Sequence, residues 1–92
     1  MTKYLMVAVE FANGVPCPHA GQYLRSFEHD TRDGLGFGMF TPRRKRAKHF
    51  NSREELFEFW KRQSTIQPLR PDGEPNRPLT ALTVTIEPVE EE

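Results

Sequence analysis

A capped amphipathic helix in the second half of the chain is the strongest constraint on the fold. Ser52 is a favourable N-cap residue, and Glu55 three positions later completes a capping box. Acidic residues precede the cations Lys61 and Arg62, an order that suits the helix dipole. A helix from Ser52 to about Gln63 places three large apolar side chains toward one face, namely Leu56, Phe59 and Trp60.

Four other segments have the composition of β-strands, at residues 4–11, 21–28, 36–41 and 79–89. The first is apolar on both faces, so we expect it in the centre of a sheet, paired with the last. Asp33-Gly34 between the second and third predicts an antiparallel hairpin. In the second strand, alternation places Tyr23 and Phe27 on one face and Leu24 on the other.

The order of elements is therefore β-β-β-α-β, an α+β fold with a small antiparallel sheet of three or four strands packed against one helix. With 92 residues the chain has room for one domain, which we place at residues 1–89. Residues 90–92 form an acidic tail. Seven Phe, one Trp and two Tyr predict an aromatic core filled by Phe59 and Trp60.

The charge balance argues against a protein that wraps nucleic acid. Thirteen basic and thirteen acidic residues give a net charge of zero. A single cysteine excludes an intrachain disulfide and fits a reducing cytoplasm. The first apolar run, 4–9, is too short to span a membrane, so we expect a soluble cytoplasmic protein without a membrane partner.

A basic run just before the helix is the first candidate binding site. Its cations could contact phosphates, with nearby aromatic rings stacking on bases. They could equally bind an anionic protein, or only form a solvated surface. The candidate residues are Arg43, Arg44, Arg46 and Lys48.

The proline-rich loop 64–78 is the second candidate site. Arg70 and Arg77 flank a turn stiffened by prolines, and a rigid loop loses little entropy when it binds a partner. The alternative is that the loop only crosses the sheet and fixes the final strand.

No residue pattern indicates catalysis, a metal or a cofactor. Gly34, Gly36 and Gly38 alternate, but no helix follows them as a phosphate-binding loop requires. Cys17 and His19 lack the spacing of a structural zinc site, with or without His29 and a nearby aspartate. Cys17 as a nucleophile, with His19 or His49 as its base, has no supporting signature.

Several short motifs carry a resemblance to a known group of proteins. They are Gly21-Gln-Tyr-Leu, Phe40-Thr-Pro, Ala47-x-x-Phe50, Ser52-x-Glu-Glu-Leu56 and Arg70-Pro-Asp-Gly. Together with the Gly-rich hairpin and Pro78-Leu-Thr-Ala, they make residues 21–86 resemble small uncharacterised bacterial proteins often carried in prophage regions. The resemblance implies a small accessory protein in a bacterial cytoplasm and assigns no functional residue.

These observations favour a non-catalytic binding module that acts by protein–protein contact. We expect its contact surface to combine the basic run with the loop from Arg70 to Arg77. The alternative is a nucleic-acid-binding accessory protein that uses residues 43–48. The protein partner is unknown, and the chain is expected to be a monomer or a homodimer. An uncovered sheet edge would invite strand-addition binding or dimerisation.

Overall fold

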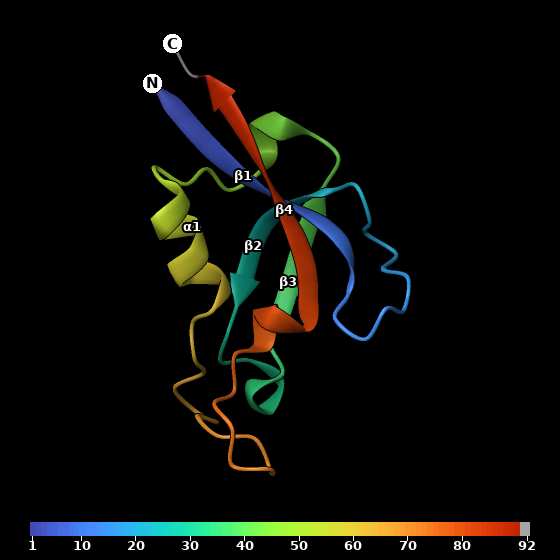
Figure 1. Ribbon diagram of the computed structural model, residues 1–92, viewed down its shortest axis with the longest axis vertical. Coiled ribbons are helices and arrows are strands. Elements are labelled where there is room, and N and C mark those ends of the chain that lie inside the picture. The colour runs from blue at the N-terminus through green and yellow to red at the C-terminus, as the bar shows by residue number, and fades with distance from the viewer. Residues whose placement is uncertain (91–92) are drawn as a thin grey trace.

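The first and last strands form the longest pairing in the molecule. The computed structural model describes residues 1–90, in which β1 (Thr2–Phe11) lies antiparallel to β4 (Leu82–Glu90). The register runs from Thr2 opposite Glu90 to Phe11 opposite Leu82. This confirms the predicted pairing, and Figure 1 shows both chain ends at the same end of the molecule.

The hairpin predicted in the first half of the chain is also present. β2 (Tyr23–Glu28) pairs antiparallel with β3 (Phe37–Thr41), and a short 3₁₀ turn, η1 (Arg32–Gly34), lies in the connection. The order β3-β2-β1-β4 makes β1 central, as expected, and leaves β3 and β4 at the edges. A four-stranded antiparallel sheet with one α-helix confirms the predicted α+β fold.

The expected alternation of side chains along β2 is wrong, because a β-bulge interrupts it. Leu24 lies opposite Phe40 and Ser26 lies opposite Met39, so Arg25 is the extra residue. The bulge shifts the alternation by one position, and Phe27 therefore faces the same side as Leu24. Both pack into the core, whereas the sequence pattern places Phe27 on the face of Tyr23.

The helix begins where the sequence predicts. In α1 (Arg53–Trp60), Ser52 Oγ accepts a hydrogen bond of 3.0 Å from the backbone N–H of Glu55. The Glu55 carboxylate accepts in return from the backbone N–H of Asn51, at 3.2 Å. The first bond satisfies an N–H group of the first helical turn, and the second ties the residue before the N-cap to the helix.

The helix ends earlier than predicted, at Trp60 rather than near Gln63. The carbonyl oxygen of Phe59 accepts a 3.0 Å hydrogen bond from the His29 ring and a 3.4 Å bond from the backbone N–H of Arg62. This carbonyl would accept from the N–H of Gln63 if the helix continued. A contact from His29, the residue directly after β2, thus occupies the carbonyl at which α1 ends.

The final strand begins at Leu82, three residues later than expected. The residues before it form a 3₁₀ turn, η3 (Pro78–Ala81), whose first position suits proline because it needs no N–H donor. The strand extends to Glu90, which the sequence analysis assigns to the acidic tail. Glu91 and Glu92 lie outside the described residues.

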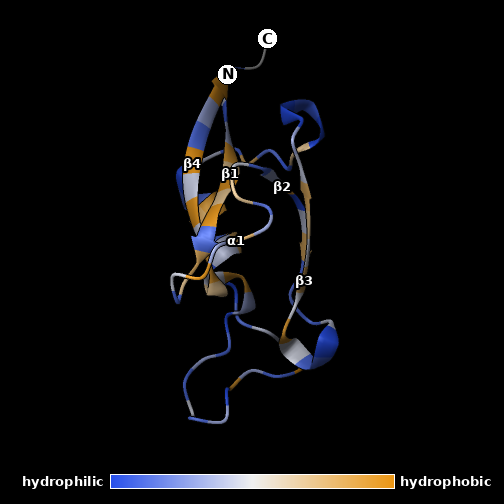
Figure 2. Ribbon diagram, turned by 90° about the vertical axis from the view of Figure 1, so that its right-hand side faces the viewer, coloured by the Kyte–Doolittle hydropathy of each residue, from blue (hydrophilic) through white to orange (hydrophobic). Residues whose placement is uncertain are grey.

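The core lies between the strand pairs and the helix. Figure 2 shows β1 and β4 diverging from β3, with α1 on the inner side of β1.

The predicted alternation of β4 is confirmed, since Leu82, Val84 and Ile86 all contact the core. Trp60 is only half-buried, and its Nε1 donates to the carbonyl of Leu82 at 3.0 Å. The buried cluster consists of Met6, Ala8, Cys17, Leu24, Phe50, Leu56, Phe59, Leu79 and Leu82.

Candidate binding surfaces

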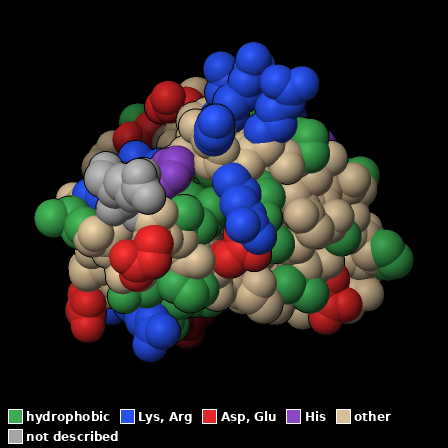
Figure 3. All heavy atoms as spheres, turned by 90° about the horizontal axis from the view of Figure 1, so that it is seen from above, with side chains coloured by type: hydrophobic (Ala, Val, Ile, Leu, Met, Phe, Trp, Pro, Cys, Tyr) green, Lys and Arg blue, Asp and Glu red, His purple; other side chains and the backbone are tan. Residues whose placement is uncertain are grey.

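The basic run forms an exposed turn at one end of the molecule. Its centre is a 3₁₀ turn, η2 (Arg44–Arg46), closed by a 3.1 Å hydrogen bond from the N–H of Arg46 to the carbonyl of Arg43. Figure 3 views the molecule from this end and shows a block of Lys and Arg side chains projecting from it. Arg43, Lys45 and Arg46 are all exposed.

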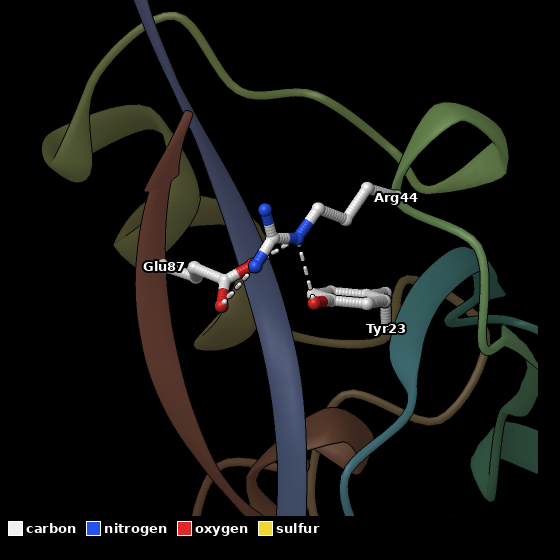
Figure 4. A network of polar contacts seen from close by, with 3 residues as sticks. All are labelled: Tyr23, Arg44 and Glu87. Carbon is white, nitrogen blue, oxygen red and sulfur yellow. Dashed lines mark hydrogen bonds and ion pairs between the residues drawn. The ribbon is translucent and has the colours of Figure 1, made fainter. Parts of the chain in front are cut away.

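Arg44 differs from its neighbours because its guanidinium reaches back across the sheet. Nε lies 3.0 Å from the Tyr23 hydroxyl and 3.1 Å from a carboxylate oxygen of Glu87. Figure 4 shows the side chain crossing β1 to join β2 with β4. The hydrogen bond to Tyr23 and the charge of Glu87 raise the pKa of Arg44 above its ordinary value. This predicted site residue therefore has a structural contact within the fold.

Lys48 is also engaged within the fold. Its ammonium lies 5.0 Å from the centre of the Phe59 ring and 5.5 Å from that of Phe50, in cation–π geometry. Its backbone N–H donates to the carbonyl of Leu24 at 2.9 Å. Of the four predicted cations in the basic run, Arg43 and Arg46 are exposed and make no such contact with any residue in 1–90.

Hydrogen bonds hold the proline-rich loop at both of its ends. Asp30 accepts three hydrogen bonds, one from the Ser64 hydroxyl at 3.0 Å and two from Thr65 at 2.7 Å. Bonds from Thr65 and Ser64 lower the pKa of Asp30. At the other end, Asn76 Nδ2 donates to the carbonyls of Gly34 and Gln67, at 2.8 and 2.9 Å. The loop is therefore attached to both ends of the connection between β2 and β3.

The two predicted sets of site residues do not form one surface. Figure 1 shows η2 near the end that carries the chain termini and the loop 64–78 at the opposite end. The molecule is 45 Å long, so a single small ligand cannot contact both. The basic run and the loop are two separate candidate sites.

Arg70 and Arg77 do come together, in a hollow of about 440 Å³. The loop forms one side of it, and the turn after β1 and residues just before β3 form the other. Arg70 is paired with Asp72 at 3.0 Å. The residues from outside the loop that line this hollow are Phe11, Ala12, Asn13, Gly34, Leu35, Thr80 and Ala81.

A second hollow, of about 200 Å³, adjoins the first, and the two share Phe11, Leu35, Pro78 and Ala81. Its other lining residues are mainly apolar, and β3 contributes Gly38 and Phe40. We call the two hollows together the edge groove. It has an apolar part beside β3 and a basic part at the loop.

The strand beside the edge groove has an outer edge that pairs with no other described strand. In the part of the chain that the structure describes, β3 pairs only with β2. The strand sequence Phe-Gly-Met-Phe-Thr contains no charge and no proline. Phe37 and Met39, on the side of the strand away from Phe40, are 43% and 45% exposed, and Leu35 just before the strand is 77% exposed. The strand order thus places at β3 an open edge of the kind that invites strand addition.

The residues considered for metal binding or catalysis take other contacts. The His19 ring stacks on Phe40, with centroids 4.6 Å apart. The buried thiol of Cys17 accepts from the backbone N–H of His19 at 3.4 Å. Within residues 1–90, no three His, Cys, Asp or Glu side chains are grouped to hold a metal ion, and no helix is long and apolar enough to cross a membrane.

The comparisons with known proteins add no relative. No family model matches the chain, and neither the curated proteins nor the solved structures include a significant match. The resemblance to prophage-borne bacterial proteins therefore stays a prediction.

Proposed function

We propose that this protein is a non-catalytic binding module that captures an extended segment of a partner protein on the free edge of β3. The observation that carries the proposal is a free edge strand with no charged residue of its own, flanked by apolar surface on both faces. The one cation over it is Arg32, whose guanidinium lies 5.1 Å from the centre of the Phe37 ring, among the described residues. Natural proteins usually guard such edges with charges, prolines or bulges, since free backbone groups pair readily with another chain. Strand addition is a common way to recognise peptides.

The other edge strand, β4, is less suited to strand addition than β3. β4 carries Glu87, Pro88 and Glu90, and Pro88 lacks the N–H that a sheet ladder requires. β3 has none of these features. The two edges therefore differ in their capacity to accept a further strand, and β3 is the one suited to binding.

The charges after β3 favour a different protein over a second copy of this chain. In an antiparallel pairing of two β3 strands, the residues after Thr41 of one copy would run beside Leu35 and Gly34 of the other. That would bring Arg43 of one copy toward the hollow that holds Arg70 and Arg77. Like charges brought together oppose association, so the basic run disfavours self-pairing.

Selection from a peptide library tests the proposal. Octapeptides with randomised sequences would be displayed on a carrier, and those that bind the protein would be sequenced and synthesised. We expect peptides that alternate apolar side chains. Their affinity should fall about tenfold or more in a Phe37→Lys/Met39→Lys variant, because lysines discourage strand addition. The matched control Thr85→Lys, with one charge added to β4, should bind normally. Failure to select any peptide would refute the proposal.

Nucleic-acid binding is the second candidate, and the exposed Arg43, Lys45 and Arg46 favour it. Phosphate contacts would make affinity fall steeply between about 50 and 200 mM salt. Replacing these three residues with Gln should then abolish an electrophoretic shift of DNA or RNA, while Arg25→Gln should not. No shift of either nucleic acid by the wild-type protein at about 50 mM salt would exclude this candidate.

A bacterial, phage-derived accessory role and a cytoplasmic location complete the proposal. The sequence motifs of residues 21–86 support the first. The single cysteine, Cys17, supports the second.

A further inference from the structure

The two parts of the edge groove differ in charge. The part beside β3 is lined by rings and aliphatic groups, including Phe27, Phe40 and Leu82. The other part is bordered by Arg70 and Arg77. A ligand that fills both parts would therefore be apolar where it lies beside β3 and anionic at the end that enters the basic part.

Arg77 is the cation available to such a ligand. Its side chain is exposed, and among residues 1–90 it takes part in no ion pair. The guanidinium of Arg70, in contrast, is paired with Asp72. The amide group of Asn76, also at this hollow, already donates to the carbonyls of Gly34 and Gln67.

The backbone around Arg77 is held in place before any ligand binds. Its carbonyl accepts from the N–H of Thr80 at 3.0 Å and from the Thr80 hydroxyl at 2.6 Å. The preceding residue, Asn76, is bonded to the carbonyl of Pro68 as well as to that of Gly34. A cation on a rigid support loses less entropy on binding than one on a mobile loop.

The direction of strand pairing decides which end of the ligand meets Arg77. All strand pairs in this sheet are antiparallel. A segment added to β3 in the same sense runs from the Thr41 end of β3 toward Leu35, so its C-terminal end arrives at the basic hollow. That hollow is walled by the loop and by the turn after β1, which suits a chain that ends there.

We infer that the edge groove recognises the C-terminal segment of a partner protein, with the terminal carboxylate bound by Arg77. This inference rests on the proposed capture of an extended segment by β3. It adds the direction of the segment and the chemistry of its end. Hydrogen bonds between a guanidinium and a carboxylate are about twice as strong as neutral ones, so the carboxylate should contribute strongly to affinity.

The experiment compares two displays of the octapeptide library. One display leaves the peptide C-terminus free, and the other embeds the peptide inside a carrier chain. Selection should succeed mainly from the first. The best peptide is then synthesised as a free acid and as a C-terminal amide, and both are titrated into the protein by calorimetry. The acid should bind about tenfold more tightly or better, a difference of about 1.4 kcal/mol.

Two variants then test whether Arg77 causes the preference for the acid over the amide. In Arg77→Gln the acid and the amide should bind equally, whereas Arg25→Gln, which removes an exposed charge from β2, should keep the preference. Thermal unfolding of each variant verifies that it folds. Equal binding of acid and amide by the wild type, or an unchanged preference in Arg77→Gln, would overturn this inference and leave strand capture standing. Failure of both displays to yield a binder would refute strand capture itself.

Discussion

His29 Nε2 lies 3.0 Å from the carbonyl oxygen of Phe59, so the residue directly after β2 is hydrogen-bonded to the last turn of the helix. The His29 ring is buried between the rings of Phe27 and Phe59, with centroids 4.8 and 5.0 Å away. Arg62, whose charge opposes a proton on this ring, is nearby. This contact joins the strand pair that carries the proposed binding edge to the helix.

Stability should decrease in mild acid because of this histidine. Burial lowers the pKa of His29 below its ordinary value of 6.5, so the folded protein binds the proton less readily than the unfolded chain. The stabilising contribution is fully present above about pH 6.5 and is lost as pH falls through the lower folded-state pKa. Thermal unfolding from pH 8 to 5 should show this decline. His29→Gln, which can still donate to Phe59, should flatten it, and the exposed-residue control His19→Gln should not.

Two glycines allow a matched test of close packing. Gly36 and Gly73 both have positive φ, at +82° and +86°, so alanine introduces backbone strain at each. A Cβ at Gly36 would also lie 2.4 Å from Phe27 Cζ, whereas nothing lies within 4 Å of one at Gly73. We expect Gly73→Ala to lower the free energy of unfolding by about 1 kcal/mol and Gly36→Ala by about 2–4 kcal/mol. Equal losses in chemical denaturation would show that Phe27 is not packed as described.

Core and groove residues should differ sharply in their effect on stability. Leu24 is fully buried, so Leu24→Ala should lower the free energy of unfolding by about 2–5 kcal/mol. Leu35 in the groove is 77% exposed, and Leu35→Ala should change stability by less than about 0.5 kcal/mol. The same Leu35 variant should weaken binding of a selected peptide. Unaltered binding would remove Leu35 from the proposed site.

The arginines of the basic run should separate into two groups. Arg44→Gln breaks the bonds to Tyr23 and Glu87 and should lower the melting temperature. Arg43→Gln and Arg46→Gln remove exposed charges and should leave it unchanged. Since ion pairs at the surface are screened by salt, the effect of Arg44→Gln should shrink in about 1 M salt. Equal melting temperatures for the three variants would argue against the Arg44 network.

Local sequence patterns predicted most of the fold but little of the candidate site. The cap at Ser52 and the alternation of the last strand are local signals, and both are confirmed. The bulge at Arg25 has no local signature in the sequence, so the predicted face for the Phe27 side chain is wrong. The end of the helix depends on His29, thirty positions away in the sequence.

The candidate binding surfaces depend on contacts between residues that are even farther apart in the sequence. Arg44 and Glu87 are 43 positions apart, and nothing in the basic run distinguishes Arg44 from its neighbours. The edge groove joins Phe11, Leu35 and Arg77, which only the folded chain brings together. One signal was present in the sequence, namely the uncharged stretch 35–41, in which glycines alternate with apolar residues as far as Met39. Its position at the sheet edge became clear only from the strand order.

Amide hydrogen exchange of β3, with and without a peptide selected by the protein, tests the central claim most directly. Backbone N–H groups on the outer edge of β3 should exchange rapidly in the free protein and become protected when the peptide binds, because an added strand accepts their hydrogen bonds. Amides of β4 should be unaffected. A peptide that binds without protecting Phe37–Thr41, or that protects β4 or η2 instead, would contradict strand capture by β3.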